Sequence, residues 1–179
     1  MENKLCVALG DFDGVHLGHR RLLDVTVNNP YGFIPAVYTF NGNCKGAKVI
    51  MTGTEKRARL TELGVKRIIF DDFEKVRRLS PQEFAENVLF KRLNAGAVVC
   101  GMDFRFGRNA AGDIGLLTEL CRSAGVFLLT VDCLAGQHGK LSSSDIRLMI
   151  RNGEMEKAAA ALGSRFFVTG TVSHGKRLG

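Results

Sequence analysis

The segment ALGDFDGVHLGH, residues 8–19, follows a short apolar run and contains three glycines, two aspartates and two histidines. Gly10 and Gly14 allow a tight turn from a strand into a helix, so that the N–H groups of the first helical turn face outward from the carboxyl edge of a sheet. His16 and His19 are three residues apart, which places both side chains on the same side of that turn. This arrangement is typical of a phosphate-binding site in an α/β protein.

The two histidines suit phosphate chemistry. Imidazole can donate hydrogen bonds to phosphate oxygens, and it stabilises charge that develops on a transferring phosphoryl group near neutral pH. The alternative is a glycine-rich turn with two surface histidines, but the spacing of three after a strand favours the phosphate interpretation. The sequence matches neither GxxxxGK[ST] nor GxGxxG, which excludes a P-loop ATPase and a dinucleotide-binding fingerprint.

Short apolar runs alternate with segments of helical period along the rest of the chain. This alternation predicts the α/β class, with a parallel sheet and helices on both faces. The predicted strands cover residues 4–9, 34–40, 67–71, 97–101 and 126–131. The predicted helices cover residues 16–28, 52–64, 80–94, 112–124, 142–151 and 154–162. Thr52 with Glu55, and Ser80 with Glu83, form capping boxes that mark two of the helix starts.

Length and composition indicate one main domain, which we place at residues 1–163. The chain has 179 residues, of which 45% are hydrophobic. After residue 163 the pattern changes, because FFVTGTVSHGKRLG, residues 166–179, has the character of a β-strand followed by a glycine turn. We therefore expect residues 164–179 to begin a second, all-β domain.

The net charge and the cysteine content indicate which binding partners and which cellular compartment to expect. A net charge of +7 fits anionic substrates, but the basic residues are scattered and tryptophan is absent, so nucleic-acid binding is not expected. Five widely spaced cysteines, with no CxxC pair, predict free thiols in the cytoplasm and no protein metal site. No apolar run is long enough for a membrane span. The sequence carries no signal for an oligomeric state.

Two later segments carry further polar groups at helix starts and strand ends. LSSSDIR, residues 141–147, begins a predicted helix, where Ser143 and Ser144 offer hydroxyl and N–H groups and Arg147 adds a positive charge. A serine-capped helix with one surface arginine is the equal alternative. MDFRFGRN, residues 102–109, places Asp103 and Arg105 on the loop after the fourth strand, at the edge where α/β proteins bind ligands.

These segments together resemble one enzyme family. H-x-G-H at residues 16–19 resembles the nucleotidylyltransferases, and ALGDFDGVHLGHRRLL, residues 8–23, resembles the opening of the bacterial bifunctional riboflavin kinase/FAD synthetases. CGMDFRFGRNAAGD, residues 100–113, is similar to that family's G-x-D-F-R-F-G-x-x-x-x-G-D, and LSSSDIR is similar to its I-S-S-T-x-I-R. The three motifs occur in the same order as in the family and extend over nearly the whole chain.

The resemblance implies a Rossmann-like nucleotidylyltransferase fold and an FMN adenylyltransferase, which transfers AMP from ATP to FMN and releases pyrophosphate. Magnesium is expected to accompany ATP. The implied catalytic residues are His16, His19 and Arg147. The implied binding residues are Gly10, Phe12, Asp13, Gly14, Asn41, Asp103, Arg105, Ser143 and Ser144. Residues 164–179 resemble only the first strand of the flavokinase barrel, so riboflavin kinase activity is not expected.

One loop departs from the family. The family has T-F-D-P-H-P after its second strand, whereas this chain has TFNGNCKG, residues 39–46, with Asn41 in place of aspartate and Gly42 in place of proline. We expect the looser loop to lower affinity, and the double change Asn41→Asp with Gly42→Pro to tighten binding if the loop geometry accepts proline. Two alternatives remain open: a nucleotidylyltransferase that acts on phosphopantetheine or a nicotinamide nucleotide, and a non-catalytic flavin- or nucleotide-binding domain.

Overall fold

A five-stranded parallel sheet forms the centre of the structure, a computed structural model that describes residues 4–42, 48–132, 135–136 and 139–172. The strand order is β3-β2-β1-β4-β5, and every neighbouring pair is parallel. The strands are β1 (Leu5–Leu9), β2 (Ile34–Phe40), β3 (Arg67–Asp71), β4 (Ala95–Gly101) and β5 (Phe127–Val131). All five predicted strands are therefore confirmed, and the α/β class with them.

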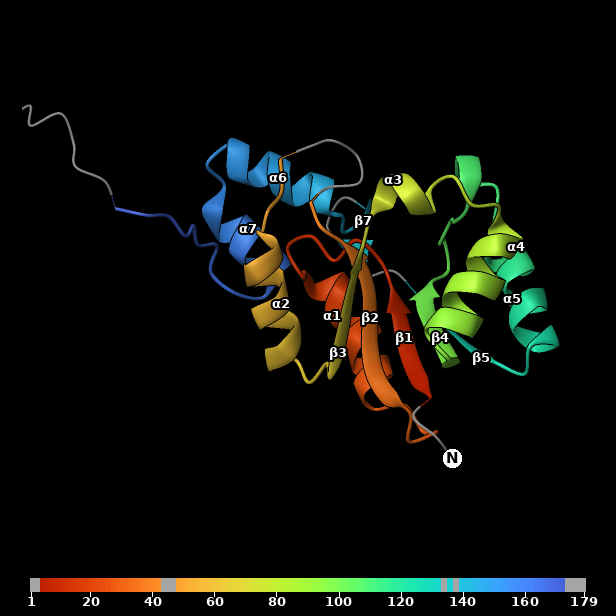
Figure 1. Ribbon diagram of the computed structural model, residues 1–179. Helices are drawn as coiled ribbons and strands as arrows, with labels where there is room; N and C mark the ends of the chain where they lie inside the picture. Colours follow the sequence, from red (N-terminus) through yellow and green to blue (C-terminus); the bar gives the residue numbers. More distant parts are fainter. Residues whose placement is uncertain (1–3, 43–47, 133–134, 137–138, 173–179) are drawn as a thin grey trace, which may run out of the picture.

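Helices cover both faces of the sheet (Figure 1). One face packs against α1 (Leu17–Val27), α2 (Gly53–Glu62), α6 (Ser143–Arg151) and α7 (Met155–Leu162). The other face packs against α3 (Phe73–Val76), α4 (Pro81–Glu83), the π-helix η1 (Phe84–Arg92) and α5 (Ile114–Ser123). The short elements are the 3₁₀ turn η2 (Arg108–Ala110) and the antiparallel pair β6 (Ala135–Gly136) and β7 (Gly139–Lys140).

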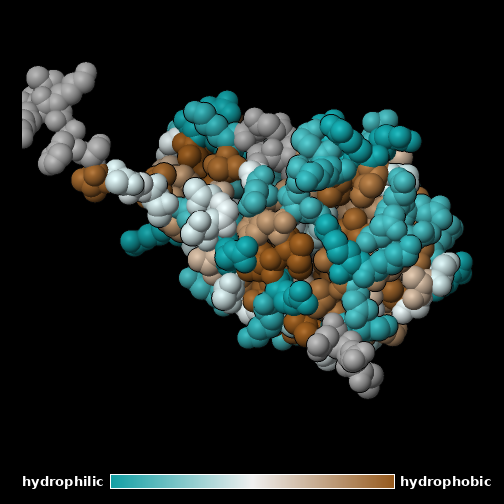
Figure 2. All heavy atoms as spheres, viewed as in Figure 1, coloured by the Kyte–Doolittle hydropathy of each residue, from teal (hydrophilic) through white to brown (hydrophobic). Residues whose placement is uncertain are grey.

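The core lies in two layers, one on each side of the sheet. All five residues of β1 are buried, because apolar side chains that alternate in direction fill both layers. Cys6 and Ala8 face the layer of α1, whereas Leu5, Val7 and Leu9 face the layer of η1 and α5. β3 forms one edge, and Figure 2 shows apolar side chains at the surface between α2 and α3, where this edge lies. The sheet is thus sealed at its centre and open along β3.

Two expectations about secondary structure are wrong, and one short helix was not expected. Residues 84–92 form a π-helix and not the predicted α-helix, and its residues Phe84, Val88 and Leu89 are buried. The short helix α3 was not predicted. Residues 166–172 form no strand, since no neighbouring strand pairs with them and Val168 and Val172 are exposed. Residues 173–179 of the expected second domain lie outside the described residues.

Candidate active site

Two adjoining cavities lie at the carboxyl ends of the central strands. β1 pairs with β2 on one side and with β4 on the other, so the direction of strand order reverses at β1, where α/β proteins bind their ligands. The first cavity has a volume of about 260 Å³ and the second about 480 Å³. Leu9, Gly10, Asp11 and Phe104 line both, which makes them a shared wall between the cavities.

Two helices begin at the first cavity. Gly18 of α1 and Ser143 and Ser144 of α6 line it, so the N–H groups at both helix starts surround one space. Helix starts carry partial positive charge and unpaired N–H donors, which attract anions. Ser142, not Ser143 or Ser144, caps α6, and it forms a capping box with Asp145. The helix starts therefore make the cavity suited to an anion.

His16 and His19 lie against each other at the start of α1. Their rings stack with centroids 3.6 Å apart, and the N–H of His19 donates to Nδ1 of His16 over 3.4 Å. His16 is the N-cap residue and is buried except for its face on the cavity, whereas His19 is half-buried and packs against the ring of Phe12. Both imidazoles line the first cavity, as the spacing predicted.

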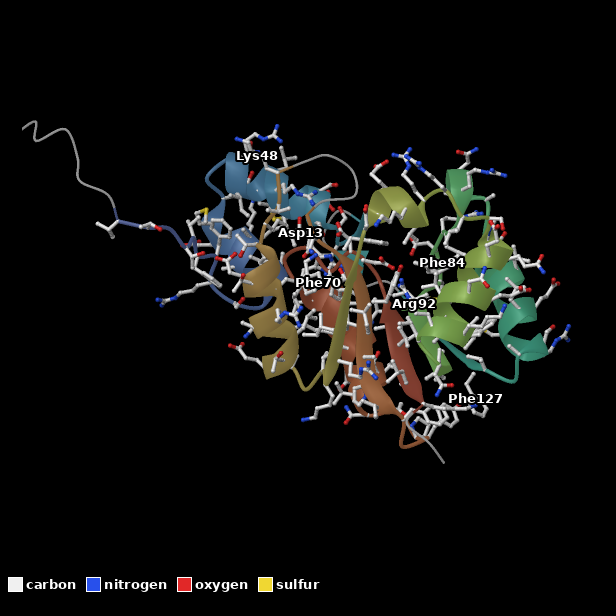
Figure 3. The ribbon with its side chains drawn as sticks, in the orientation of Figure 1. Asp13, Lys48, Phe70, Phe84, Arg92 and Phe127 are labelled. Carbon is white, nitrogen blue, oxygen red and sulfur yellow. The ribbon has the colours of Figure 1, made fainter. Side chains whose placement is uncertain are left out.

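Asp13 joins the glycine turn to α6. Its carboxylate is fully buried, and Oδ2 lies 2.6 Å from Nη2 of Arg147. Oδ1 accepts the N–H groups of Ile50 and Met51 over 2.9 and 3.2 Å. The hydroxyl of Ser143 donates to the carbonyl of Asp13 over 2.9 Å. Figure 3 shows Asp13 below α6, at the ends of the strands. The start of α6 and the glycine turn therefore form one rigid unit.

The glycine turn holds an unfavourable backbone conformation. Phe12 has φ 52° and Val15 has φ 40°, so both lie in the left-handed region. This conformation is uncommon for any residue other than glycine, and it is an outlier for the β-branched Val15. Both side chains are fully buried in the layer of α1, which supplies the packing energy that maintains the strain. Gly14 has φ 79°, and a Cβ there would lie 3.1 Å from Ile50 and Leu162. Burial thus fixes the path of the turn.

Aromatic rings form a large part of the lining of the second cavity. Its aromatic residues are Tyr38, Phe40, Phe73, Phe84, Phe104 and Phe106. Phe104 and Phe106 stack on each other with centroids 5.8 Å apart, and Phe84 lies 5.8 Å from Phe106. Arg77 and Arg105 add positive charge to the lining. A flat aromatic ring system with a polar tail fits such a space.

A polar network stabilises the rim of the second cavity. The phenol of Tyr38 donates to Asp71 Oδ2 over 2.6 Å, and Arg92 forms an ion pair with the same carboxylate. Burial raises the pKa of Asp71, but the hydrogen bonds from Arg92 and Tyr38 outweigh it, so the pKa lies below its ordinary value. Burial and the bond to Asp71 raise the pKa of Tyr38. Tyr38 therefore remains a neutral donor, with its ring fixed against Phe40 and Phe84.

The structure brings most of the predicted site residues together. Seven of them line the first cavity: Gly10, His16, His19, Asp103, Ser143, Ser144 and Arg147. Arg105 lines the second cavity. Phe12, Asp13 and Gly14 lie in the core beneath the turn and line neither cavity. Asn41 is exposed beside the start of α2 and also lines neither.

The altered loop does not have the conformation that proline requires. Gly42 has φ 83°, whereas proline fixes φ near −65°, so the loop does not meet the condition on which tighter binding by the double variant was expected. Asn43 and Cys44 of the same loop lie outside the described residues. The substitution of glycine for proline therefore accompanies a different turn, not merely a more flexible one.

Sequence reasoning missed Lys56, Asp11 and the aromatic lining of the second cavity. Lys56 is buried although it is charged, and the only sign in the sequence is its position four residues before Leu60 on the apolar face of α2. The aromatic residues come from separated segments, β2, α3, η1 and the loop after β4, and only the fold brings them together.

The described residues also bear on what the sequence predicts about metal ligands, membrane-spanning helices and cysteines. Among the described residues, no group of three or more histidine, cysteine, aspartate or glutamate side chains could hold a metal ion. Within the same residues, no helix combines the length and apolar character that a bilayer crossing requires. Cys6, Cys100 and Cys121 are free and buried, and burial raises their thiol pKa to about 12, 12 and 11. Cys44 and Cys133 lie outside the described residues.

The parallel sheet with its order reversal at β1, and the cavity at the carboxyl ends of its strands, give the chain the α/β fold of the nucleotidylyltransferase class. The sequence profile of one family within it, described as FAD synthetase, matches residues 1–145. The chain belongs to the FAD synthetase family, as its three motifs predicted.

Individual relatives agree with the family match. An FAD synthetase from Listeria monocytogenes is 28% identical over 97% of this chain and 74% of its own length. A bifunctional riboflavin kinase/FMN adenylyltransferase from Bacillus subtilis is 33% identical over 98% of this chain and 58% of its own length. A crystal structure described as a macrolide-efflux protein from Streptococcus pneumoniae has a TM-score of 0.82, at 28% identity, over 93% of this chain and 57% of that one. The chain thus spans a little under three fifths of several longer proteins.

Proposed function

We propose that this chain transfers AMP from ATP to FMN and so forms FAD and pyrophosphate. Membership of the FAD synthetase family supports the activity. The observation that carries the residue assignment is the pair of adjoining cavities, one surrounded by helix starts and histidines and the other by aromatic rings. Transfer of a group between two substrates requires that both are held in contact. Cavities that share lining residues lie next to each other, which permits this contact.

ATP phosphates occupy the first cavity in this proposal. The N–H groups at the starts of α1 and α6 bind phosphate oxygens, and Ser143 and Ser144 add hydroxyl groups. Among the described residues, the buried Nε of Arg147 has no hydrogen-bond partner, which leaves one donor for a phosphate beside the pair with Asp13. His16 and His19 stabilise the charge that develops on the α-phosphate and on the leaving pyrophosphate. No covalent intermediate with the protein is needed.

The flavin ring occupies the second cavity. Stacking on Phe104 and Phe106 gives it contact area, and Arg105 offers a donor to its polar tail. The FMN phosphate then lies at Gly10 and Asp11, the wall that both cavities share, and an oxygen of that phosphate attacks the α-phosphate of ATP. The P–O bond to the β-phosphate breaks, and the electron pair leaves with pyrophosphate.

Magnesium enters this proposal as an ion bound to ATP. Among the described residues there is no cluster of three or more metal-ligating side chains, and Mg²⁺ commonly binds through substrate phosphates and waters with few protein ligands. When bound, the ion neutralises phosphate charge. We also propose that the protein acts in the cytoplasm on these small molecules and not on nucleic acid. The free buried thiols and the absence of interleaved basic and aromatic residues support both points.

Product analysis tests the proposal. The purified chain is incubated with ATP, Mg²⁺ and either FMN or riboflavin, and the flavins are separated by chromatography while pyrophosphate is measured. We expect FAD and pyrophosphate in equal amounts from FMN, and no FMN from riboflavin. FMN binding without pyrophosphate release would support a non-catalytic flavin-binding domain. Pyrophosphate release only with phosphopantetheine or a nicotinamide nucleotide would support a different nucleotidylyltransferase.

A further inference from the structure

A lysine is buried beneath the wall between the two cavities. Lys56 lies on the inner side of α2, and only 2% of its side chain is exposed. A buried ammonium group is costly unless hydrogen bonds and charge compensate it. Its Nζ donates to the carbonyl of Asp11 over 2.6 Å, to the carbonyl of Phe40 over 3.1 Å and to Oγ1 of Thr39 over 3.5 Å. These bonds use all three ammonium protons.

The contacts of Lys56 converge on a single residue of the wall. Thr39 Oγ1 also donates to the carbonyl of Asp11, over 2.7 Å, so the lysine and the threonine hold the same backbone oxygen. The N–H of Gly10 donates to the carbonyl of Tyr38 over 3.3 Å. The end of β2 and the start of α2 therefore fix the backbone of Gly10 and Asp11, which carries the shared wall.

The negative charge of the Asp11 side chain would repel the anionic substrates of the proposed reaction. This side chain is 30% exposed, and Asp11 belongs to the lining of both cavities, where the proposal places two polyanions. At 4 Å, two like charges repel each other about four times more strongly at the effective dielectric constant of a protein surface than in water. Lys56 Nζ lies 3.8 Å from Asp11 Oδ1, so it offsets this negative charge from below.

We propose that Lys56 is a positioning residue, which holds the Asp11 backbone in place and offsets the Asp11 carboxylate so that two anionic substrates can meet at the wall between the cavities. This inference rests on the proposed function for the identity of the substrates. It assigns Lys56 no contact with the reacting atoms. Its effect on anion binding acts through the charge of Asp11, whereas its effect on stability acts through the three oxygens that it binds.

A double-mutant cycle separates these two effects. The proteins are the wild type, Lys56→Met, Asp11→Asn and the double variant, with Lys66→Met as control, because Lys66 is exposed and lines neither cavity. Titration calorimetry measures the affinity for inorganic pyrophosphate and for ATP with Mg²⁺, and thermal unfolding is recorded separately. We expect Lys56→Met to weaken pyrophosphate binding by about tenfold, and by less than about threefold when Asp11 is already Asn.

Pyrophosphate as the probe keeps this test independent of FAD formation, which product analysis decides. If Lys56→Met does not fold, Asp11→Asn alone remains informative, since removal of the carboxylate charge should then tighten pyrophosphate binding by about threefold or more. An equal loss of affinity from Lys56→Met in both backgrounds would overturn the inference, because the lysine would then act on structure or directly on the anion and not through Asp11. Unchanged or weaker binding in Asp11→Asn, or no pyrophosphate binding by the wild type, would also overturn it.

Discussion

Asp13→Asn is expected to lower the free energy of unfolding by about 3 kcal/mol. The asparagine carbonyl can still accept the N–H groups of Ile50 and Met51, but its NH₂ group faces the guanidinium of Arg147, so a donor meets a donor. Removal of one partner of a buried ion pair costs about 3–5 kcal/mol. We take the lower end because 14% of the Arg147 side chain is exposed, which lets it move toward water.

For a chain of this length, 3 kcal/mol corresponds to a fall in Tm of about 6–12 °C. Circular dichroism during heating and urea titration measures both quantities, and Asp24→Asn, at an exposed carboxylate, serves as the control. Adding Arg147→Met should recover part of the loss, since no charge is then left unpaired. A loss below about 1 kcal/mol for Asp13→Asn, or strictly additive effects in the double variant, would refute the view that this pair fastens α6 to the glycine turn.

Four further substitutions test the site and its surroundings. His16→Ala and His19→Ala should each lower kcat for FAD formation by about a hundredfold with little change in KM, and steady-state kinetics with unchanged kcat would contradict their role. The pKa of Asp71 is lower in the folded chain than its ordinary value of 3.8, so its stabilising effect is present above that pH and disappears as the pH falls through the folded pKa. Urea unfolding of wild type and Asp71→Asn should therefore differ at neutral pH and converge in acid, and a constant difference would count against this. Gly42→Pro should lower stability by more than about 1 kcal/mol because φ is 83°, and equal Tm values would disprove it.

Local patterns predicted the strands, most helices and the first cavity. Apolar runs bounded by glycine indicate strands. His16 and His19 belong to one short motif and Arg147 to another, and the residues within each motif lie close together because they are neighbours in the sequence. The role of Asp13 could not be predicted, because its partners Arg147 and Ile50 are 134 and 37 residues away. The motif position alone suggested a ligand contact, whereas burial makes Asp13 an internal anchor.

The aromatic cavity and the π-helix were beyond sequence reasoning for a related reason. Phe84 has the same helical pattern whether its turn is closed by i→i+4 or i→i+5 bonds, and only packing against Phe106 and Tyr38 distinguishes them. The strand expected after residue 166 is the opposite case, in which the local pattern indicates a strand that the structure does not form. An alternating apolar pattern satisfies the propensity of a strand, but a strand also needs a neighbour for its backbone hydrogen bonds.

The π-helix η1 also gives the molecule an adjustable part. The first cavity is built on turns that a buried ion pair and strained backbone hold in one shape. The second cavity depends on Phe84, at the first turn of η1. Loss of one residue from η1 would let α-helical turns replace its wide turns, which narrows the segment that carries Phe84. Length variation in this single segment can thus reshape the aromatic cavity while the first cavity stays unchanged, so the two halves of the site can evolve at different rates.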